Sequence, residues 1–384
     1  MINKIAIIVI VLINLSLLEL LSFTILNFLP NLTYDQSRIE QEFDEYIAKR
    51  DSILGWNIIV DDFGNSRHLI NRKNVTNTLF QIDFYGDSFT YGEGVNNDSL
   101  IWSNLISEKT NTIVNNRGVG GYGTDQAFLK YINSRSEGNI VVLNHLSENI
   151  IRNVNQFRHL IYPGKSFDLK PVFISENDSL KLIEIPDIHN ENFKNFQENP
   201  NEFLKHDFFK IGSQSGIYNK RFPFSFTLFK SFLSNWKITS QLNYFSGYQP
   251  FYDKNHSSGA LEITKLIIEE FNTDVIKNNS KPIITIIPTY RDFEYFEKYG
   301  IFPYQTLIEE LNDKIELIDF GMEFLSEINS LDMDILLDLY IEPAGHMNEK
   351  GHYLLSKVFV KYLIINNYLW VNYFNICGQR KSSG

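Results

Sequence analysis

Cysteine is almost absent from this chain of 384 residues, whose only one, Cys377, lies near the C-terminus. A single cysteine cannot form an intramolecular disulfide, and it argues against a cysteine-based zinc site. Histidine pairs one helical turn apart are also missing, since His346 and His352 are too far apart in sequence to form one. We therefore expect no metal site. The cysteine count leaves the cellular compartment open.

Clustered positive charge is missing as well. The chain has 35 Lys and Arg residues against 46 Asp and Glu, a formal net charge of −11, and no Lys/Arg cluster stands out. Nucleic-acid-binding proteins concentrate positive charge on one face, so we expect no nucleic-acid partner. No internal repeat is visible. The length exceeds that of a usual single domain, which predicts one large domain with additional segments.

The N-terminal segment is strongly apolar. The stretch "IAIIVIVLINLSLLELLSFTILNFLP" supplies about 25 mostly apolar residues, enough for a helix to cross about 30 Å of hydrocarbon. A cleaved signal peptide usually has a shorter apolar core and a small-residue cleavage site, and neither is evident. We therefore interpret residues 1–30 as a transmembrane anchor that contacts the membrane through residues 5–29, with a cleaved signal as the alternative.

The charges around this segment predict its orientation. Lys4 and the amino terminus are the only positive charges ahead of it, which favours a single-pass protein with its N-terminus inside and the remaining chain extracytoplasmic. Glu19 lies within the span, where a charge costs about 2.5 to 3.5 kcal/mol at the centre. One interpretation is a contact with another membrane protein through Glu19; the other is an acid that a long apolar helix tolerates.

Residues 31–78 are polar and mixed, and we interpret them as a juxtamembrane stalk that packs on the domain after it. From residue 79 the pattern alternates between strand and helix. Strands are predicted at 79–86, 112–118, 139–146, 282–289 and 315–321, and helices at 100–110, 125–135, 257–277, 304–313 and 349–366. Ser257 or Ser258 is expected to cap the third of these helices, and Asn348 the last. This pattern predicts an α/β domain of about five mostly parallel strands with helices on both faces.

Residues 156–250 interrupt the alternation and are rich in Phe, Tyr and Asn, so we interpret them as an insertion. Within it, residues 170–186 predict a β-hairpin around Glu176-Asn177-Asp178. The stretch "FPFSFTLFKSFLSNW", residues 222–236, fits either an aromatic helix or a covering flap. The aromatic side chains of the insertion serve either ordinary packing or a substrate-binding rim.

Ser88 follows the first predicted strand in "FYGDSFTYGEG", residues 84–94. Ligands of parallel α/β sheets bind at the carboxyl ends of the strands, which is where Ser88 falls. The residue is placed either as a nucleophile or as the cap of a helix. A serine nucleophile needs a base within hydrogen-bond reach and donors for the oxyanion that forms on attack.

Four short blocks supply such groups, and together they resemble the SGNH, or GDSL-type, hydrolase family. They are "YGDSFTYGEG", "NNRGVGGYGTDQ", "LNHLSENIIRN" and "EPAGHMNEKGH", in the order that the family has along a flavodoxin-like domain. The resemblance implies Ser88 as nucleophile and His346 as general base. It implies an oxyanion hole of the Ser88 N–H, the Gly121 N–H and the Asn149 side chain, with Gly120 as the nearest competitor of Gly121. The glycine-rich block does not have the spacing of a dinucleotide fingerprint, and we expect no cofactor.

The chain departs from the family pattern at the acid that orients the histidine. This acid usually lies three residues before the histidine, a position that Pro343 occupies here. Glu342, four residues before His346, has a longer reach and is our candidate for this role. The alternatives are a Ser–His dyad oriented by a backbone carbonyl and a catalytically inactive copy; Asp338 is a distant candidate. Loss of the acid is costly in triad enzymes.

The resemblance implies a membrane-anchored serine esterase or O-acyltransferase that works through an acyl-Ser88 intermediate. Its expected substrate is an O-acyl ester of a carbohydrate, an envelope glycan or a lipid. A different class of function is a non-catalytic envelope protein that keeps the fold as a glycan-binding or scaffolding module. A soluble cytoplasmic esterase would require that the first 30 residues are not a span.

Overall fold

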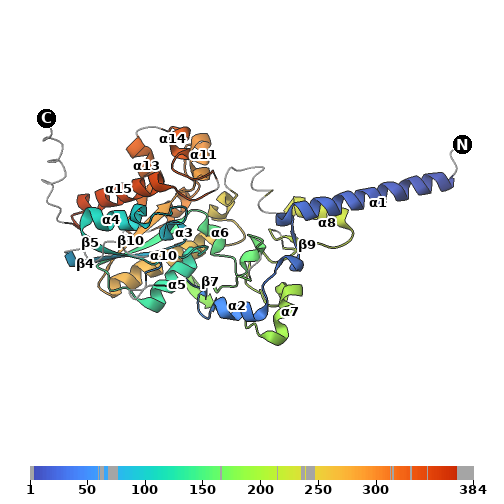
Figure 1. The fold of residues 1–384 in the computed structure, drawn as a ribbon, viewed down its shortest axis with the longest axis horizontal. Coiled ribbons are helices and arrows are strands. Elements are labelled where there is room, and N and C mark those ends of the chain that lie inside the picture. The colour runs from blue at the N-terminus through green and yellow to red at the C-terminus, as the bar shows by residue number, and fades with distance from the viewer. Residues whose placement is uncertain are drawn as a thin grey trace.

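The computed structural model describes residues 4–369, apart from residues 59, 61–64, 68–76, 165–166, 214, 235–237, 239–246, 312, 314, 329–330 and 344. Cys377 lies outside the described residues. Figure 1 shows an α/β domain from which one long helix, α1, projects at one end.

A five-stranded sheet forms the centre of the domain, in the order β11-β10-β6-β4-β5. All four neighbouring pairs are parallel. The strands are β4 (Asn77–Tyr85), β5 (Thr112–Asn116), β6 (Ile140–Leu146), β10 (Lys281–Ile287) and β11 (Leu317–Asp319). In chain order this is 2-1-3-4-5, the strand order of flavodoxin-like folds. The predicted fold class is therefore confirmed.

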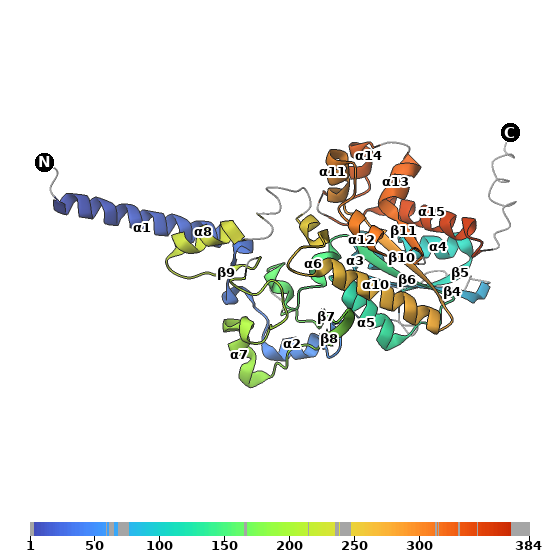
Figure 2. The ribbon, with the colours of Figure 1, turned by 180° about the vertical axis from the view of Figure 1, so that it is seen from behind.

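Helices cover both faces of the sheet and complete three layers (Figures 1 and 2). One face carries α4 (Trp102–Thr110), α13 (Phe320–Ile328) and α15 (Glu349–Ile365), and the other carries α5 (Thr124–Ser134) and α10 (Ala260–Lys277). Shorter helices lie in the loops: α3 (Ser88–Tyr91), α6 (Asn149–Arg152), α11 (Tyr290–Tyr299), α12 (Gln305–Glu310) and α14 (Met333–Leu337).

Two predicted helix caps can be compared with the structure. The Asn348 side chain accepts hydrogen bonds from the N–H groups of Lys350 and Gly351 at the start of α15, as predicted. Helix α10 begins at Ala260, so its N-cap residue is Gly259, and neither Ser257 nor Ser258 holds that position as predicted. Ser258 nevertheless accepts a hydrogen bond from the first helical N–H, that of Ala260, at 3.1 Å.

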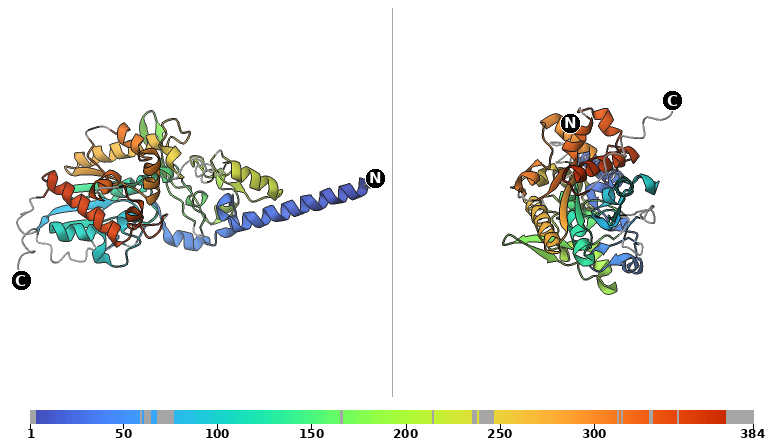
Figure 3. Two further views of the ribbon diagram at one scale, coloured as in Figure 1. Left: turned by 90° about the horizontal axis from the view of Figure 1, so that it is seen from above. Right: turned by 90° about the vertical axis from the view of Figure 1, so that its left-hand side faces the viewer.

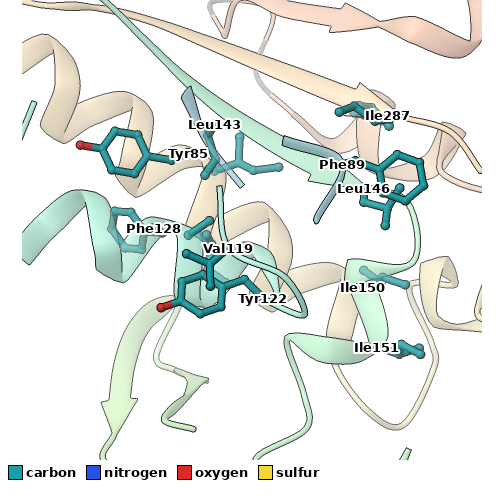
Figure 4. Close-up of a cluster of buried hydrophobic side chains, with 14 of the residues drawn as sticks. Tyr85, Phe89, Val119, Tyr122, Phe128, Leu143, Leu146, Ile150, Ile151 and Ile287 are labelled. Carbon is teal, nitrogen blue, oxygen red and sulfur yellow. The ribbon is translucent and has the colours of Figure 1, made fainter. Parts of the chain in front are cut away.

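Apolar packing continues beneath the carboxyl ends of the strands. Strand β6 is buried along its whole length, as expected of a strand covered on both faces. Figure 4 shows Phe89, Leu146, Ile150 and Ile287 gathered near one another in this buried cluster. All four are at most 6% exposed. The loops that follow β4, β6 and β10 thus rest on a packed floor, which restricts how their polar residues can move.

Residues 31–58 pack against the insertion and the domain. They form α2 (Phe43–Lys49), the short antiparallel pair β2 (Arg50–Asp51) and β3 (Gly55–Trp56), and β1 (Thr33–Tyr34). Strand β1 pairs in parallel with β9 (Tyr218–Asn219) of the insertion. The Tyr34 O–H donates to the Gln197 carbonyl at 2.6 Å. The segment after α1 is therefore held by residues far away in sequence.

The insertion contains the predicted hairpin, formed by β7 (Val172–Glu176) and β8 (Ser179–Ile183). Asn177 and Asp178 both have positive φ, 53° and 57°, as a two-residue type I′ turn requires. Helix α7 (Asn190–Glu198) follows. Several aromatic side chains of this region pack on one another in the core, as the packing alternative predicts: Phe157, Phe167, Phe193 and Phe196.

Helix α1 (Lys4–Phe28) is the one helix among the described residues that is long and apolar enough to cross a membrane by length and composition. Of the stretch at 222–236, residues Phe224–Ser234 form a helix, α8, as the helix alternative predicts, and residues 235–236 lie outside the described residues. Helix α8 lies along the domain-proximal half of α1 (Figure 3, left; Figure 1). Glu19 of α1 accepts a hydrogen bond from the Ser225 side chain of α8. Glu19 thus has a hydrogen-bonding partner within the chain, so its position in α1 does not require a contact with a second membrane protein.

Candidate active site

Ser88 is the first residue of helix α3, directly after β4, and it is 4% exposed. The cap of this helix is Asp87, whose Oδ1 accepts the Phe89 N–H at 2.9 Å. A side chain at Gly86 would not fit, because a Cβ there would lie 2.0 Å from Thr90 Oγ1. Because Asp87 caps the helix, Ser88 does not, and its hydroxyl is available for another role.

His346 faces this hydroxyl from the loop before α15. Its Nε2 lies 2.9 Å from Ser88 Oγ, across 258 residues of sequence. The loop is held at both ends, since the His346 carbonyl accepts the Ile341 N–H at 2.9 Å and the Asn348 side chain donates to the Asp338 and Tyr340 carbonyls. The imidazole packs against the Phe89 ring, with centroids 5.3 Å apart. The predicted nucleophile and base thus form the hydrogen bond that their roles require.

Asn149 begins helix α6 at the end of β6 and is fully buried. Neither its Nδ2 nor its Oδ1 has a hydrogen-bond partner among the described residues. The amide nevertheless interacts with the Asp87 carboxyl and helps to lower the pKa of that group. Asn149 is therefore placed beside the nucleophile block, with its amide near Asp87 but not in a short hydrogen bond.

The glycine-rich loop lies next to the nucleophile block. A Cβ at Gly118 would meet the Tyr91 backbone nitrogen at 2.3 Å, and one at Gly120 would lie 3.4 Å from Glu93 Oε2. Gly121 has φ of +81°, a conformation that favours glycine. Hydrogen bonds between described residues leave the N–H groups of Gly120 and Gly121 unused. The structure does not decide between the two as oxyanion donors.

Glu342, the predicted acid, is exposed. Within the described part of the chain its carboxylate forms no hydrogen bond or ion pair with His346; its backbone carbonyl accepts the Gly345 N–H at 2.9 Å. Asp338 instead pairs with Lys350. The assignment of Glu342 as the orienting acid stays a prediction.

Glu93 is a carboxylate that the sequence interpretation missed. Its Oε2 lies 3.8 Å from His346 Nε2, the nitrogen that faces Ser88. A triad acid binds the other ring nitrogen, so Glu93 is not placed as one. It stands on the solvent side of the site, 54% exposed, between the imidazole and the glycine-rich loop. The sequence feature that could have pointed to Glu93 is its position in the first block, five residues after Ser88.

Arg152 joins three of the four blocks. Its Nη1 donates to the Tyr122 carbonyl at 3.0 Å and lies 3.6 Å from Asp87 Oδ2, and its Nη2 donates to Glu148 Oε1 at 2.8 Å. Burial raises the pKa of Asp87, and the Arg152 cation opposes this shift. Burial would also raise the pKa of Glu148, but Arg152 and the Tyr162 hydroxyl outweigh it and hold this pKa below its ordinary value.

A second buried network ties the end of β6 to the end of β10. Asp292 accepts hydrogen bonds from the Ser147 O–H at 2.5 Å, the Tyr248 O–H at 2.7 Å and the Thr289 N–H at 2.7 Å. Burial raises the pKa of Asp292 to about 6 despite these donors. Ser147 is two residues before Asn149, so this network positions the start of α6.

The glycine-rich loop is also held from outside the four blocks. The Trp56 Nε1–H donates to the Gly120 carbonyl at 3.1 Å, and the Tyr122 O–H donates to the Trp56 carbonyl at 2.7 Å. The Arg158 guanidinium donates to the Gly121 carbonyl at 2.5 Å. These bonds fix the carbonyl side of the loop, so that its N–H groups keep one orientation. None of these supports was predicted.

Two other histidines, His145 and His352, are buried in the core. Burial lowers the pKa of His145 and of His352 to about 3, so both rings are neutral at physiological pH. His145 contacts Thr124 Oγ1 and the Tyr252 hydroxyl, and His352 accepts the Trp102 N–H. Among the described residues, no group of three or more His, Cys, Asp or Glu side chains is placed to hold a metal ion.

No protein-family model matches this chain, and no curated protein matches it in sequence. Solved structures to which it is similar include a member of the lipolytic G-D-S-L family from Veillonella parvula, with 11% identity and a TM-score of 0.34 over 74% of this chain and 98% of that one. A second is an acetyl xylan esterase from the rumen bacterium Butyrivibrio proteoclasticus, with 12% identity and a TM-score of 0.33 over 76% and 65%. A third is a carbohydrate esterase family 2 enzyme from Myceliophthora fergusii, with 11% identity and a TM-score of 0.33 over 75% and 67%.

Proposed function

We propose that this chain is a membrane-anchored, SGNH-type serine hydrolase that acts on an O-acyl ester of a carbohydrate, an envelope glycan or a lipid. The observation that carries the proposal is the 2.9 Å contact of Ser88 Oγ with His346 Nε2, at the carboxyl edge of a flavodoxin-like sheet. The four blocks that suggested the family come together at this edge through Arg152, Glu93 and the Ser88–His346 pair.

In the first half-reaction, Ser88 Oγ attacks the carbonyl carbon of the ester while its proton passes to His346 Nε2. The negative charge that develops on the carbonyl oxygen is stabilised by the N–H groups of Ser88 and Gly121 and by Asn149 Nδ2. The intermediate then collapses: the bond to the alcohol oxygen breaks, and the alcohol takes the proton from His346. The acyl group remains on Ser88.

In the second half-reaction, an acceptor hydroxyl gives its proton to His346 and attacks the acyl-Ser88 carbonyl carbon. The proton returns to Ser88 Oγ as the acyl group leaves. Water as acceptor makes the enzyme an esterase, and a sugar hydroxyl makes it an O-acyltransferase. The same residues serve both outcomes.

The described geometry favours a Ser88–His346 pair without a carboxylate on Nδ1. Glu342 is exposed, and its carboxylate forms no hydrogen bond or ion pair with His346 among the described residues. Glu93 supplies a negative charge near Nε2 and can stabilise the imidazolium that forms during attack. We propose this electrostatic role for Glu93. The orienting role of Glu342 stays the sequence-based alternative, which the Glu342→Gln variant tests.

The non-catalytic alternative has to explain Asn149. A buried amide without a short hydrogen bond costs about 1 to 3 kcal/mol, a cost that a scaffold could avoid with an apolar side chain. A buried polar group of this kind needs an explanation such as a catalytic role. An oxyanion that forms on attack at Ser88 is the partner that Asn149 Nδ2 fits, and this supports catalysis over scaffolding.

Helix α1 supports the membrane part of the proposal. It exposes large apolar side chains along most of its length, and the Asn14, Thr24 and Asn27 side chains donate to carbonyls one turn earlier in the helix. Such internal hydrogen bonds let polar residues enter a bilayer. With the N-terminus inside, the catalytic domain would be extracytoplasmic.

The test is active-site labelling of the full chain in detergent micelles. Wild type is treated with a fluorophosphonate probe and assayed with p-nitrophenyl acetate, next to Ser88→Ala, His346→Ala and the matched control Ser99→Ala. We expect labelling and turnover in wild type and Ser99→Ala and their loss in Ser88→Ala and His346→Ala. Unlabelled wild type, or labelling that Ser88→Ala leaves unchanged, contradicts the proposed enzyme.

A further inference from the structure

Helix α8 exposes a row of large apolar side chains. Phe226, Phe229 and Leu233, spaced i, i+3 and i+7, share one face and are 53%, 61% and 64% exposed. Phe222, just before the helix, is 73% exposed. A contiguous apolar face of this kind marks a surface that contacts something other than water.

The opposite side of α8 packs on α1. Thr227 and Ser231 of α8 are buried, and the buried residues of α1 are Ser22 and Leu26. Small side chains at a helix pair allow close approach and are typical of helix packing inside membranes. Figures 1 and 2 show α8 beside the half of α1 that is nearer to the domain.

Glu19 determines where along α1 the helix α8 begins. The Phe224 N–H donates to Glu19 Oε2 at 2.5 Å, and the Ser225 side chain donates to Glu19 Oε1. Glu19 precedes Phe28, the last residue of α1, by nine positions, or about 13 Å of helix. If α1 spans the membrane, the start of α8 therefore lies about 13 Å below its domain-side end.

The chain before α8 and the later turns of α8 both lie toward the domain-side end of α1. Lys220 Nζ lies 3.2 Å from Asn27 Oδ1 at the end of α1 and pairs with Asp35. The four peptide units between Lys220 and Phe224 reach at most about 13 Å. Helix α8 then rises by about 16 Å and brings Lys230 Nζ to 5.4 Å from the ring centroid of Tyr218, which lies in β9 next to Lys220.

We propose that residues 222–233 form a re-entrant membrane segment whose phenylalanine face contacts lipid acyl chains. This inference rests on the proposed anchoring by α1 and adds a second inserted element. The Glu19 carboxylate receives N–H and O–H donors from the start of α8, which offsets the cost of an acid within the span. Lys220, Arg221 and Lys230 lie toward the domain-side end of α1, where cations meet lipid phosphates.

The test uses spin labels on the full chain in vesicles of phosphatidylcholine and phosphatidylglycerol, in a Cys377→Ser background. Single nitroxides are placed by Phe229→Cys on α8, Leu21→Cys on the exposed side of α1, and Tyr353→Cys on the exposed surface of α15. Accessibility is measured to oxygen, which concentrates in hydrocarbon, and to a water-soluble nickel chelate. Phe226→Cys, on the same face as Phe229, serves if the first variant does not fold.

We expect the Phe229 label to lose access to the nickel chelate and gain access to oxygen, as the Leu21 label does, while the Tyr353 label shows the reverse. A Phe229 label open to nickel, with Leu21 protected, overturns the re-entrant segment and leaves the anchor standing. Labels open to nickel at both positions overturn the anchor and the inference with it. A Phe229 label closed to both reagents shows a protein cover, such as a second copy, and also overturns it.

Glu19 offers a matched pair of variants that tests the depth argument. Glu19→Leu removes both acceptors, and we expect the Phe229 label to regain nickel access as α8 detaches. Glu19→Gln keeps one acceptor oxygen and is expected to keep most of the protection. Unchanged protection in Glu19→Leu contradicts the proposal that Glu19 holds α8 at its depth.

Discussion

The carboxylate of Glu93 provides a quantitative test of the site electrostatics. The perturbation is Glu93→Gln, which removes the charge and nearly preserves the shape of the side chain. When Ser88 attacks the ester carbonyl, His346 takes the proton of Ser88, and the resulting imidazolium lies 3.8 Å from Glu93 Oε2. Two unit charges at about 4 Å interact by about 1 kcal/mol in water. Because Glu93 is 54% exposed and His346 33% exposed, the aqueous value applies here.

A loss of about 1 kcal/mol from the transition state lowers the rate about fivefold. We therefore expect kcat/KM for p-nitrophenyl acetate to fall about fivefold in Glu93→Gln at low salt. At 1 M salt the Debye length is about 3 Å, so wild type should approach the variant. The assay is steady-state hydrolysis at two ionic strengths, with labelling by fluorophosphonate as an independent rate.

Glu342→Gln is the matched control, because it neutralises a carboxylate that makes no contact with His346 among the described residues. We expect it to retain nearly full activity. A loss of a hundredfold or more in Glu342→Gln, with Glu93→Gln unaffected, would refute this reasoning. It would show that Glu342 orients the imidazole in the enzyme–substrate complex, as the sequence predicts.

Three further predictions concern the oxyanion hole and the buried network. Asn149→Ala should lower kcat about 10²- to 10³-fold, and because the buried side chain interacts with Asp87 we also expect a lower melting temperature. Unchanged kcat contradicts its role. Gly121→Ala should lose activity and stability, because Gly121 has φ of +81° and the new Cβ would lie 2.6 Å from Arg158 Nη1. Gly120→Ala should have a smaller effect, because its Cβ would meet only Glu93 Oε2, at 3.4 Å. Equal effects of the two variants would refute this contrast. Burial raises the pKa of Asp292 from 3.8 to about 6. Between these pH values the folded state holds a proton that the unfolded state has released, so the free energy of unfolding falls as pH rises. Denaturant unfolding of wild type should show a loss of about 3 kcal/mol over this range that Asp292→Asn does not show, and parallel pH profiles of the two proteins would contradict this prediction.

Local sequence patterns were sufficient for much of the fold. The alternation of strands and helices predicted the parallel sheet, and the resemblance of four short blocks to a family implied the flavodoxin-like strand order. The same resemblance singled out Ser88, Asn149 and His346, and the structure brings Ser88 and His346 together at the carboxyl edge of the sheet. These expectations depend on short-range patterns, which a sequence carries directly.

Contacts between segments distant in sequence were not predictable in the same way. The partner of Glu19 is 206 residues away in α8, and the Trp56 contact to the glycine loop spans 64 residues. No periodicity encodes such pairings, since they depend on where the insertion folds back. Glu93 was missed for another reason. Its neighbours in sequence form an ordinary turn, and its proximity to His346 depends on a contact between distant segments.

The hydrogen bonds between Trp56 and the loop at Gly120 and Tyr122 have a consequence for the smallest fragment that can work. A version that starts at residue 79, where the first strand pattern begins, would keep every reacting group. It would nevertheless lack the indole that holds the Gly120 carbonyl. We expect such a truncation to fold around its sheet yet present a poorly ordered glycine loop. The proposed catalytic unit therefore extends back at least to Trp56, and we expect loss of the segment before residue 79 to lower the rate of the reaction before it unfolds the domain.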